Sequence, residues 1–458
     1  MTRSSNDISD SGGPWLRTKG LGFLFGDDPP AINLQSLLKS PALGTFYASI
    51  AILAMGMVNS VELSRWLGAG GRGELAAAIL WPTLLAWTVS LGVGPAILYY
   101  AALPGARTGD IFATSLVLGL AQSAVAVLVG YLALPLILGG HGGIEVTASR
   151  WYLLMIPLGL ISNYASFILQ ARLRFVWYNV LRAFMIFGSA FAVLGLKLAG
   201  RLDVIHVVFI LLLLSVLQTV VSLVGLHSTG MAIGPHFDRP LAGKLLKYGL
   251  KVHFGSISQL GNEQLDQMLM SIFLQPVQLG LYVVAVSAAG VNGALAFAVR
   301  NVSMPRIAGA AQDRKVMLLS QVFRRFFVVS IFSAVAMASI LPAAIPLIFG
   351  NQFSRAIWPA EILLLAGLFL GWTGILTYGA LAMNNPFLSS RSSVVALVVT
   401  LVSLPPLLYF LGILGAAIAS LIAYATQFFV VAAALRKTHG FHFNPRNIPA
   451  VSSNITML

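Results

Sequence analysis

The chain has 458 residues, of which 58% are hydrophobic and only 9% are charged, and its mean hydropathy is +0.87. A soluble domain carries about 25% charged residues, so this composition excludes an ordinary soluble protein and predicts an all-α polytopic membrane protein. The chain has no cysteine, which excludes disulfides, thiolate nucleophiles and cysteine metal sites. Its seven histidines show no metal-ligand spacing, so we expect no metal site.

The predicted elements begin after a polar segment. Residues 1–40 are polar and rich in glycine and proline, and we expect a mostly disordered cytoplasmic tail rather than a signal peptide. Twelve apolar runs of about 20 residues or more follow, each long enough to cross a bilayer. They lie at about 42–63, 75–101, 112–138, 150–171, 178–199, 204–227, 250–274, 279–304, 323–349, 359–383, 392–411 and 413–435. Residues 438–458 form a second cytoplasmic tail.

The basic residues are distributed unevenly between the two sides of these spans. The net charge of +14 would suggest nucleic acid in a soluble protein. With both termini in the cytoplasm, however, 22 of the 28 lysines and arginines fall in cytoplasmic segments. Such an excess is the ordinary signature of membrane topology. The sequence therefore predicts cytoplasmic N- and C-termini, and it gives no reason to expect nucleic acid as a partner.

The longest polar connection, residues 228–249, lies between spans six and seven, and we expect it to be a cytoplasmic linker. It separates an N-terminal half, 41–227, from a C-terminal half, 250–437. The two halves also share a sequence feature: Gly73 lies at the start of span two, and Gly280 lies at the start of span eight, the second span of the other half. Six spans preserve orientation, so the two halves would be parallel repeats with a substrate path at their interface.

Span seven carries two acidic residues, Glu263 and Asp266, far from either end. A charged group at membrane depth costs roughly 2.5–3.5 kcal/mol, so such carboxylates normally face a protein interior or an aqueous cavity. A spacing of three places both on one helix face. They are candidates for a substrate or ion path, and the alternative is a structural carboxylate paired to a neighbouring helix.

Five short motifs occupy fixed places relative to the spans. They are the runs Gly68 to Ala78, Leu265 to Met270, Gln278 to Ala285, Met304 to Ala308 and Leu347 to Phe353. In this order and at these places, the chain resembles the Wzx-type flippases of polysaccharide biosynthesis. These belong to the multidrug/oligosaccharidyl-lipid/polysaccharide (MOP) transporter superfamily. The resemblance covers roughly residues 40–437.

The resemblance implies a fold and a function. The fold is about 12 transmembrane helices in two six-helix lobes related by a pseudo-two-fold axis. The function is to flip an undecaprenyl-pyrophosphate-linked repeat unit of O-antigen, capsule or exopolysaccharide. The unit moves by alternating access from the inner to the outer leaflet of the bacterial inner membrane. The substrate, the bilayer, and polymerase and chain-length proteins of the same pathway are the implied partners. No cofactor is implied beyond a coupling H⁺ or Na⁺.

Two other functions stay open. One is drug/cation antiport by a member of the same superfamily. Those exporters commonly keep an acidic residue deep in the first helix, whereas span one here has Asn59 at depth and Glu62 only near its end. The other is a membrane-embedded polymerase or glycosyltransferase of the same glycan pathway, but such enzymes usually need larger loops than those between these spans. We therefore expect a transporter and not an enzyme.

The resemblance also separates the candidate site residues. Asp266 matches the acidic position of the family's seventh helix, whereas Glu263 is supported by its depth alone. Either carboxylate would carry a coupling ion or bind sugar hydroxyls. Glu62 and Arg65, three apart near the outer end of span one, are expected to form a surface ion pair. If the repeat holds, Arg65 would instead meet a sugar or a phosphate.

The remaining candidates have an equally simple structural explanation. Arg300, Arg174 and Lys251 lie at the cytoplasmic side, where topology requires cations, and recognition of the diphosphate is the second interpretation. Amides such as Asn262 and Asn163 would line a sugar path or join helices. Four aromatic residues would stack on sugar rings or form interfacial belts: Trp81, Trp87, Trp151 and Tyr378.

Overall fold

The computed structural model describes residues 41–139, 143–230, 237–383, 385 and 387–441. The predicted tail at 1–40, and residues 442–458 of the second tail, lie outside the described residues. The described chain divides into two units, Met1–Ile50 and Ala51–Leu458. In the first unit only the beginning of one helix is described, and the arrangement below is that of the second unit. All regular structure in the described residues is helical, which confirms the all-α prediction.

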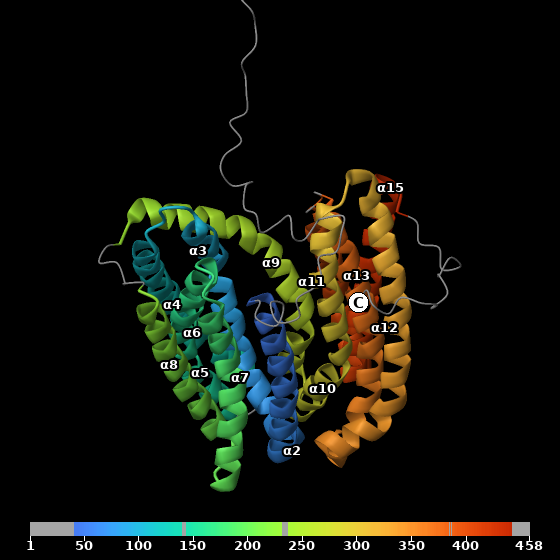
Figure 1. Ribbon diagram of the computed structural model, residues 1–458. Helices are drawn as coiled ribbons and strands as arrows, with labels where there is room; N and C mark the ends of the chain where they lie inside the picture. The colour runs from blue at the N-terminus through green and yellow to red at the C-terminus, as the bar shows by residue number, and fades with distance from the viewer. Residues whose placement is uncertain (1–40, 140–142, 231–236, 384, 386, 442–458) are drawn as a thin grey trace, which may run out of the picture. The chain divides into compact units, whose positions relative to one another are not determined.

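The described residues of the N-terminal half form seven helices, and Figure 1 shows their arrangement. They are α2 (Pro41–Val89), α3 (Val93–Ala102), α4 (Thr108–Leu138), α5 (Gly143–Tyr152), α6 (Met155–Ala171), α7 (Phe175–Leu198) and α8 (Val204–Ser228). Helix α2 contains span one and most of span two. It is interrupted at Gly68, whose φ of 74° and ψ of 179° only glycine adopts without strain.

In the C-terminal half, the described residues form seven helices and one short 3₁₀ turn. They are α9 (Arg239–Phe273), α10 (Pro276–Ala289), α11 (Val291–Gly309), α12 (Gln312–Phe349), η3 (Asn351–Ala356), α13 (Ile357–Ala382), α14 (Phe387–Leu411) and α15 (Ile413–His439). Span two is divided between α2 and α3, and span eight is divided in the same way between α10 and α11. Broken helices therefore occupy equivalent places in the two halves.

The protein is a multi-pass membrane protein. Within the described ranges, nine helical segments are long and apolar enough to cross a bilayer. Large apolar side chains on their outer faces are exposed, for example Leu136, Phe332 and Tyr409, as expected of surfaces that contact lipid. Segments α9, α10 and α11, which hold predicted spans seven and eight, are not among the nine, so the count of twelve spans stays a prediction. The side on which the termini lie also stays a prediction.

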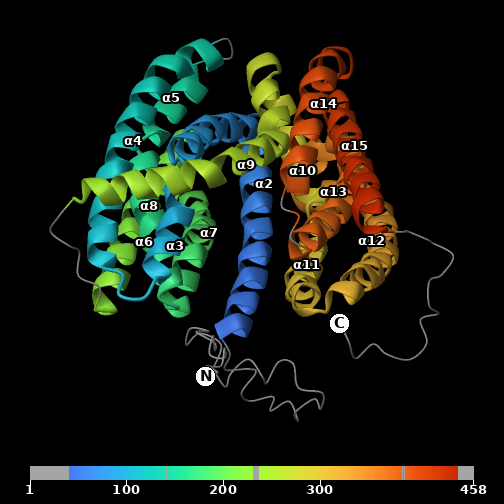
Figure 2. The ribbon, with the colours of Figure 1, turned by 90° about the horizontal axis from the view of Figure 1, so that it is seen from above.

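Helix α9 begins inside the predicted linker, since it starts at Arg239. The Asp238 side chain caps it by accepting a hydrogen bond from the backbone N–H of Leu241 at 3.1 Å, and Pro240 occupies the first turn. Figures 1 and 2 show α9 running from the helices of the N-terminal half to those of the C-terminal half. Residues 239–249 are thus helical and not an irregular connection.

The first part of α9 packs on the N-terminal half. The ring of Tyr248 stacks on that of Tyr99, with centroids 4.9 Å apart. A Cβ atom built on Gly92, between α2 and α3, would lie 2.3 Å from the carbonyl oxygen of Gly249, so the two backbones touch. Further along, the Asn262 side chain donates to the carbonyl oxygen of Ser393 on α14 at 2.8 Å. One helix therefore contacts both halves.

The two halves meet backbone to backbone at Gly73 and Gly280. A Cβ atom on Gly73 would lie 1.7 Å from the carbonyl oxygen of Pro276, and one on Gly280 would lie 2.0 Å from that of Ala69. Each would also lie 3.0 Å from the backbone nitrogen of the other glycine. Gly280 follows Gly73 by the same number of residues as Pro276 follows Ala69. In a protein built from two repeats, equivalent residues contact one another only near the axis that relates the repeats. The contact between Gly73 and Gly280 is therefore the one expected at the axis of the predicted repeat.

We expect Gly73→Ala and Gly280→Ala each to lower the thermal unfolding temperature of the purified protein, because the added methyl group would force the halves apart. Overpacking of this kind costs about 1–3 kcal/mol. Gly195→Ala on α7 is the matched control, since nothing lies within 4 Å of its Cβ position. Equal unfolding temperatures for Gly280→Ala and Gly195→Ala would contradict the close approach.

Candidate functional site

A cavity of about 600 Å³ lies between the two halves, a size within the usual range of small-molecule sites, and its mostly apolar lining includes several polar and charged side chains. The N-terminal half contributes polar side chains on α2, including Asn59 and Arg72. The C-terminal half contributes Glu263, Gln264 and Gln267 from α9. This inter-half cavity therefore brings a cation of one half and a carboxylate of the other to the same space.

Arg72 is the cation of the inter-half cavity. Its Nε atom is buried and has no hydrogen-bond partner among the described residues. Buried donors are normally paired, and a guanidinium group stays charged in proteins. Arg72 also lines the cavity, so its guanidinium group can donate to an acceptor that enters there. In the sequence, Arg72 stands out only as part of the motif from Gly68 to Ala78. Its position next to Gly73 was the available signal, because a residue beside the symmetry axis lies near the centre of the protein.

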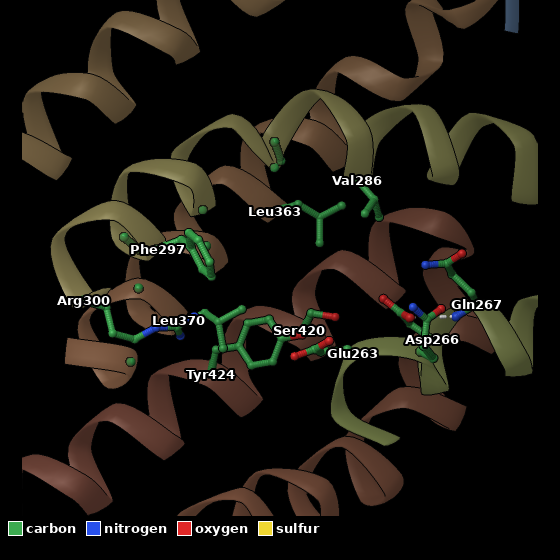
Figure 3. A pocket seen from close by; sticks show the side chains of 18 residues that line it. Glu263, Asp266, Gln267, Val286, Phe297, Arg300, Leu363, Leu370, Ser420 and Tyr424 are labelled. Carbon is green, nitrogen blue, oxygen red and sulfur yellow. Dashed lines mark hydrogen bonds between the residues drawn. The ribbon is translucent and has the colours of Figure 1, made fainter. Parts of the chain in front are cut away.

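A second cavity, of about 370 Å³, lies within the C-terminal half among α9, α10, α11, α13 and α15. Glu263 and Asp266 both line it, as their spacing of three predicts (Figure 3). Arg300 lies at the other end of this C-half cavity. Glu263, Gln264 and Gln267 line the C-half cavity and the inter-half cavity alike, so α9 forms the wall between the two.

The two carboxylates differ in their surroundings. Asp266 is buried and accepts hydrogen bonds from the hydroxyl of Tyr282 and from the backbone N–H of Gln267, the latter at 2.7 Å. Ser420 and Tyr424 of α15 lie close by (Figure 3). Glu263 is exposed to the cavities. Asp266 is therefore held in place by its donors, whereas Glu263 is accessible from both cavities.

Arg300 is held by aromatic rings. Its guanidinium carbon lies 4.4 Å from the ring centroid of Tyr378 and 5.4 Å from that of Phe297. Cations are attracted to the faces of such rings. Its Nε atom is buried without a hydrogen-bond partner among the described residues. Like Arg72, it is a largely buried cation that lines a cavity.

The ion pair expected between Glu62 and Arg65 is not formed. Arg65 is exposed and donates through Nη2 to the carbonyl oxygen of Leu347 at 3.3 Å, and Oε2 of Glu62 is buried without a hydrogen-bond partner. Leu347 lies in the last turn of α12, whose carbonyls have no partner within the helix and attract cations. Arg65 therefore connects the two halves and lines neither cavity.

The other predicted site residues lie away from both cavities. Arg174 is exposed at the start of α7, and Lys251 is exposed on α9. Asn262 is buried and joins α9 to α14 and α15, since its backbone carbonyl also accepts from the Tyr424 hydroxyl at 3.1 Å. Its place agrees with the structural alternative stated for amides of this kind.

The four aromatic candidates have four different surroundings. Trp81 donates to the hydroxyl of Ser271 on α9 at 3.0 Å and so joins the halves. Trp151 packs against Phe209 and has 46% of its side chain exposed. Tyr378 supports Arg300. Trp87 alone of the four lines the inter-half cavity.

Solved structures of transporters share this fold. The lipid II flippase MurJ in an inward closed conformation matches with a TM-score of 0.74 and 15% identity, covering 88% of each chain. An inward-facing multidrug resistance MATE family transporter of the MOP superfamily matches with a TM-score of 0.70 and 14% identity, covering 84% of this chain and 95% of that one. A MOP superfamily transporter from Pyrococcus furiosus Vc1 matches with a TM-score of 0.54 and 16% identity, covering 92% and 98%. The protein thus has the MOP transporter fold predicted from its motifs.

The family follows from the sequence itself. The family described as "Polysaccharide biosynthesis protein" matches residues 63–358, more than half of the chain. The chain belongs to this family. No curated protein matches it. The predicted resemblance to MOP superfamily members of polysaccharide biosynthesis is confirmed.

Proposed function

We propose that this protein flips an undecaprenyl-pyrophosphate-linked oligosaccharide from the cytoplasmic to the outer leaflet of a bacterial inner membrane. A hydrated sugar chain cannot cross about 30 Å of hydrocarbon unaided, whereas a polyprenyl tail can remain in lipid. The observation that carries the proposal is the inter-half cavity, with Arg72 on one side and Glu263 on the other. Membership of a polysaccharide biosynthesis family supports a glycan as the cargo.

Arg72 is the proposed ligand of the diphosphate. A guanidinium group forms paired, charge-assisted hydrogen bonds with phosphate oxygens. Its place in the lining of the inter-half cavity supports this role. Arg300, in the C-half cavity, is the second proposed contact for anionic groups. The amides of Gln264 and Gln267 line both cavities and would bind sugar hydroxyls between the two arginines.

Alternating access is the proposed mechanism, and the contacts between the halves suit it. Ser60 on α2 donates to Ser287 on α10 at 3.1 Å, and Trp81 on α2 donates to Ser271 on α9 at 3.0 Å. Span one thus meets span eight, and span two meets span seven, the crossed pattern of a two-fold axis. Single neutral hydrogen bonds contribute only about 0.5–1.5 kcal/mol each, so a rigid-body movement can break them.

Asp266 is the proposed coupling residue for H⁺ or Na⁺. It is a buried carboxylate whose donors come from α9 and α10, and α15 lies against it. A change in its charge would alter the packing of three helices of one lobe. A local charge change acting on a two-state arrangement is the usual basis of a coupled transporter.

Drug/cation antiport is the alternative, and Arg72 disfavours it. A fixed positive charge in the cavity repels a cationic drug, while it attracts a diphosphate. We also propose a transporter rather than a polymerase or a glycosyltransferase, since the matched solved structures are those of transporters and a flippase. Polymerase and chain-length proteins of the same pathway are proposed partners.

The main test replaces Arg72 by Gln in cells whose only copy of the gene carries the change. Loss of a hydrogen bond between charged groups costs about 1.5–3 kcal/mol, so we expect flipping to fall roughly 10- to 100-fold. Complete lipid-linked units should accumulate on the cytoplasmic face. Arg174→Gln, at an exposed arginine outside both cavities, is the control and should export normally. Accumulation of incomplete units would indicate failed synthesis and contradict the proposal.

Asp266→Asn should abolish the dependence of export on the ion gradient while the protein still inserts into the membrane. The replacement keeps the size and removes the charge. Export is measured in membrane vesicles with and without an imposed H⁺ or Na⁺ gradient. Wild-type export with wild-type gradient dependence would remove Asp266 from the mechanism.

In a double variant, Ser60→Cys with Ser287→Cys, a disulfide between the two introduced cysteines should stop flipping. The two hydroxyl oxygens are 3.1 Å apart, and the chain has no other cysteine to react. We expect a cross-linked peptide by mass spectrometry after oxidation, loss of export, and recovery on reduction. Undiminished export by the fully cross-linked protein would exclude movement of the halves at this contact.

A further inference from the structure

A third cavity, of about 350 Å³, lies in the N-terminal half against α2, α3, α6 and α9. The proposed mechanism makes no use of it. Thr83 and Trp87, one helical turn apart on α2, line both this N-half cavity and the inter-half cavity that contains Arg72. The two cavities are therefore neighbours that share one wall.

The N-half cavity has the composition of a small-molecule site. Most of its lining is apolar, with a few polar groups among them. Asn163 is exposed to it and offers both a donor and an acceptor. The hydroxyls of Thr83 and Ser90 donate to backbone carbonyls of their own helix region and keep acceptor capacity. An apolar surface with scattered hydroxyl-binding groups fits an amphipathic ligand better than a hydrocarbon chain.

Trp87 is the distinctive residue of the shared wall. Its side chain is 52% exposed, although it lines two cavities. Trp151 is exposed to a similar degree but lines none of the three cavities and packs on Phe209. Because Trp87 lines two cavities, a ligand that enters either one can cover its exposed apolar surface, and covering that surface is favourable. The indole also supplies a polar N–H at its edge.

We propose that the N-half cavity is a sugar subsite in which Trp87 stacks on the apolar C–H face of a pyranose ring. The ring hydroxyls would bind Asn163, Thr83 and Ser90. This inference rests on the proposed function, because the diphosphate is placed at Arg72 in the adjoining cavity. Since the two cavities share a wall, the sugar bound by Trp87 is one close to the diphosphate. The subsite would thus recognise the beginning of the repeat unit.

The test measures binding of two probes to the full-length protein in lipid nanodiscs. One probe is undecaprenyl diphosphate, and the other is the same lipid bearing a single N-acetylglucosamine. The wild type should bind the sugar-bearing probe more tightly. Trp87→Ala should weaken binding of that probe about 5- to 150-fold, the range for loss of one aromatic stacking partner, and leave binding of the sugar-free probe unchanged. Trp87→Phe should retain most of the preference.

Trp151→Ala is the matched control and should bind both probes as the wild type does. Asn163→Ala tests the same subsite without removing the aromatic ring, and we expect its affinity for the sugar-bearing probe alone to fall about 2- to 10-fold.

If Trp87→Ala weakened the binding of both probes equally, the cavity would be assigned to the lipid and the sugar subsite would be overturned. Equal binding of both probes by the wild type would also overturn it. Failure of the wild type to bind either probe would overturn the proposed function itself.

Discussion

The backbone contact between Gly73 and Gly280 is the constraint on which the rest of this arrangement depends. Only residues without side chains permit two helical segments to approach so closely, and the contact lies on the axis that relates the halves. It places Arg72, the neighbour of Gly73, in the central cavity. Helix α9, which carries Glu263 and Asp266, lies across that cavity from it.

The charged side chains of the inter-half cavity determine which ligands it can bind. Arg72 stays ionised, and an ion in a medium of low dielectric constant is costly without a partner. Glu263, Gln264 and Gln267 offer acceptors from the other half. A cavity that combines a fixed cation with amides and an aromatic wall at Trp87 matches a ligand that is anionic at one point and polar and apolar elsewhere. A sugar linked to a diphosphate has this character.

Helix α9 contacts both halves and also carries the buried carboxylate of Asp266. Its first turns pack on the N-terminal half through Tyr248 and Gly249, and its later turns hold the buried carboxylate of Asp266 in the C-terminal half. A movement of one half against the other must therefore pass through this helix. Arg65 adds a second connection, to the end of α12 through the Leu347 carbonyl, in place of a local ion pair.

The sequence by itself determined the class of the protein, because composition and hydropathy depend on no contact between distant residues. Short motifs gave the family, and the spacing of Glu263 and Asp266 gave a shared helix face, since helical periodicity is local. Tertiary structure decided that Arg72 lines the central cavity, that Arg65 bonds to the Leu347 carbonyl, and that Trp87 alone of the four aromatic candidates lines that cavity. Each of these depends on which helix lies opposite, and local sequence does not contain that information.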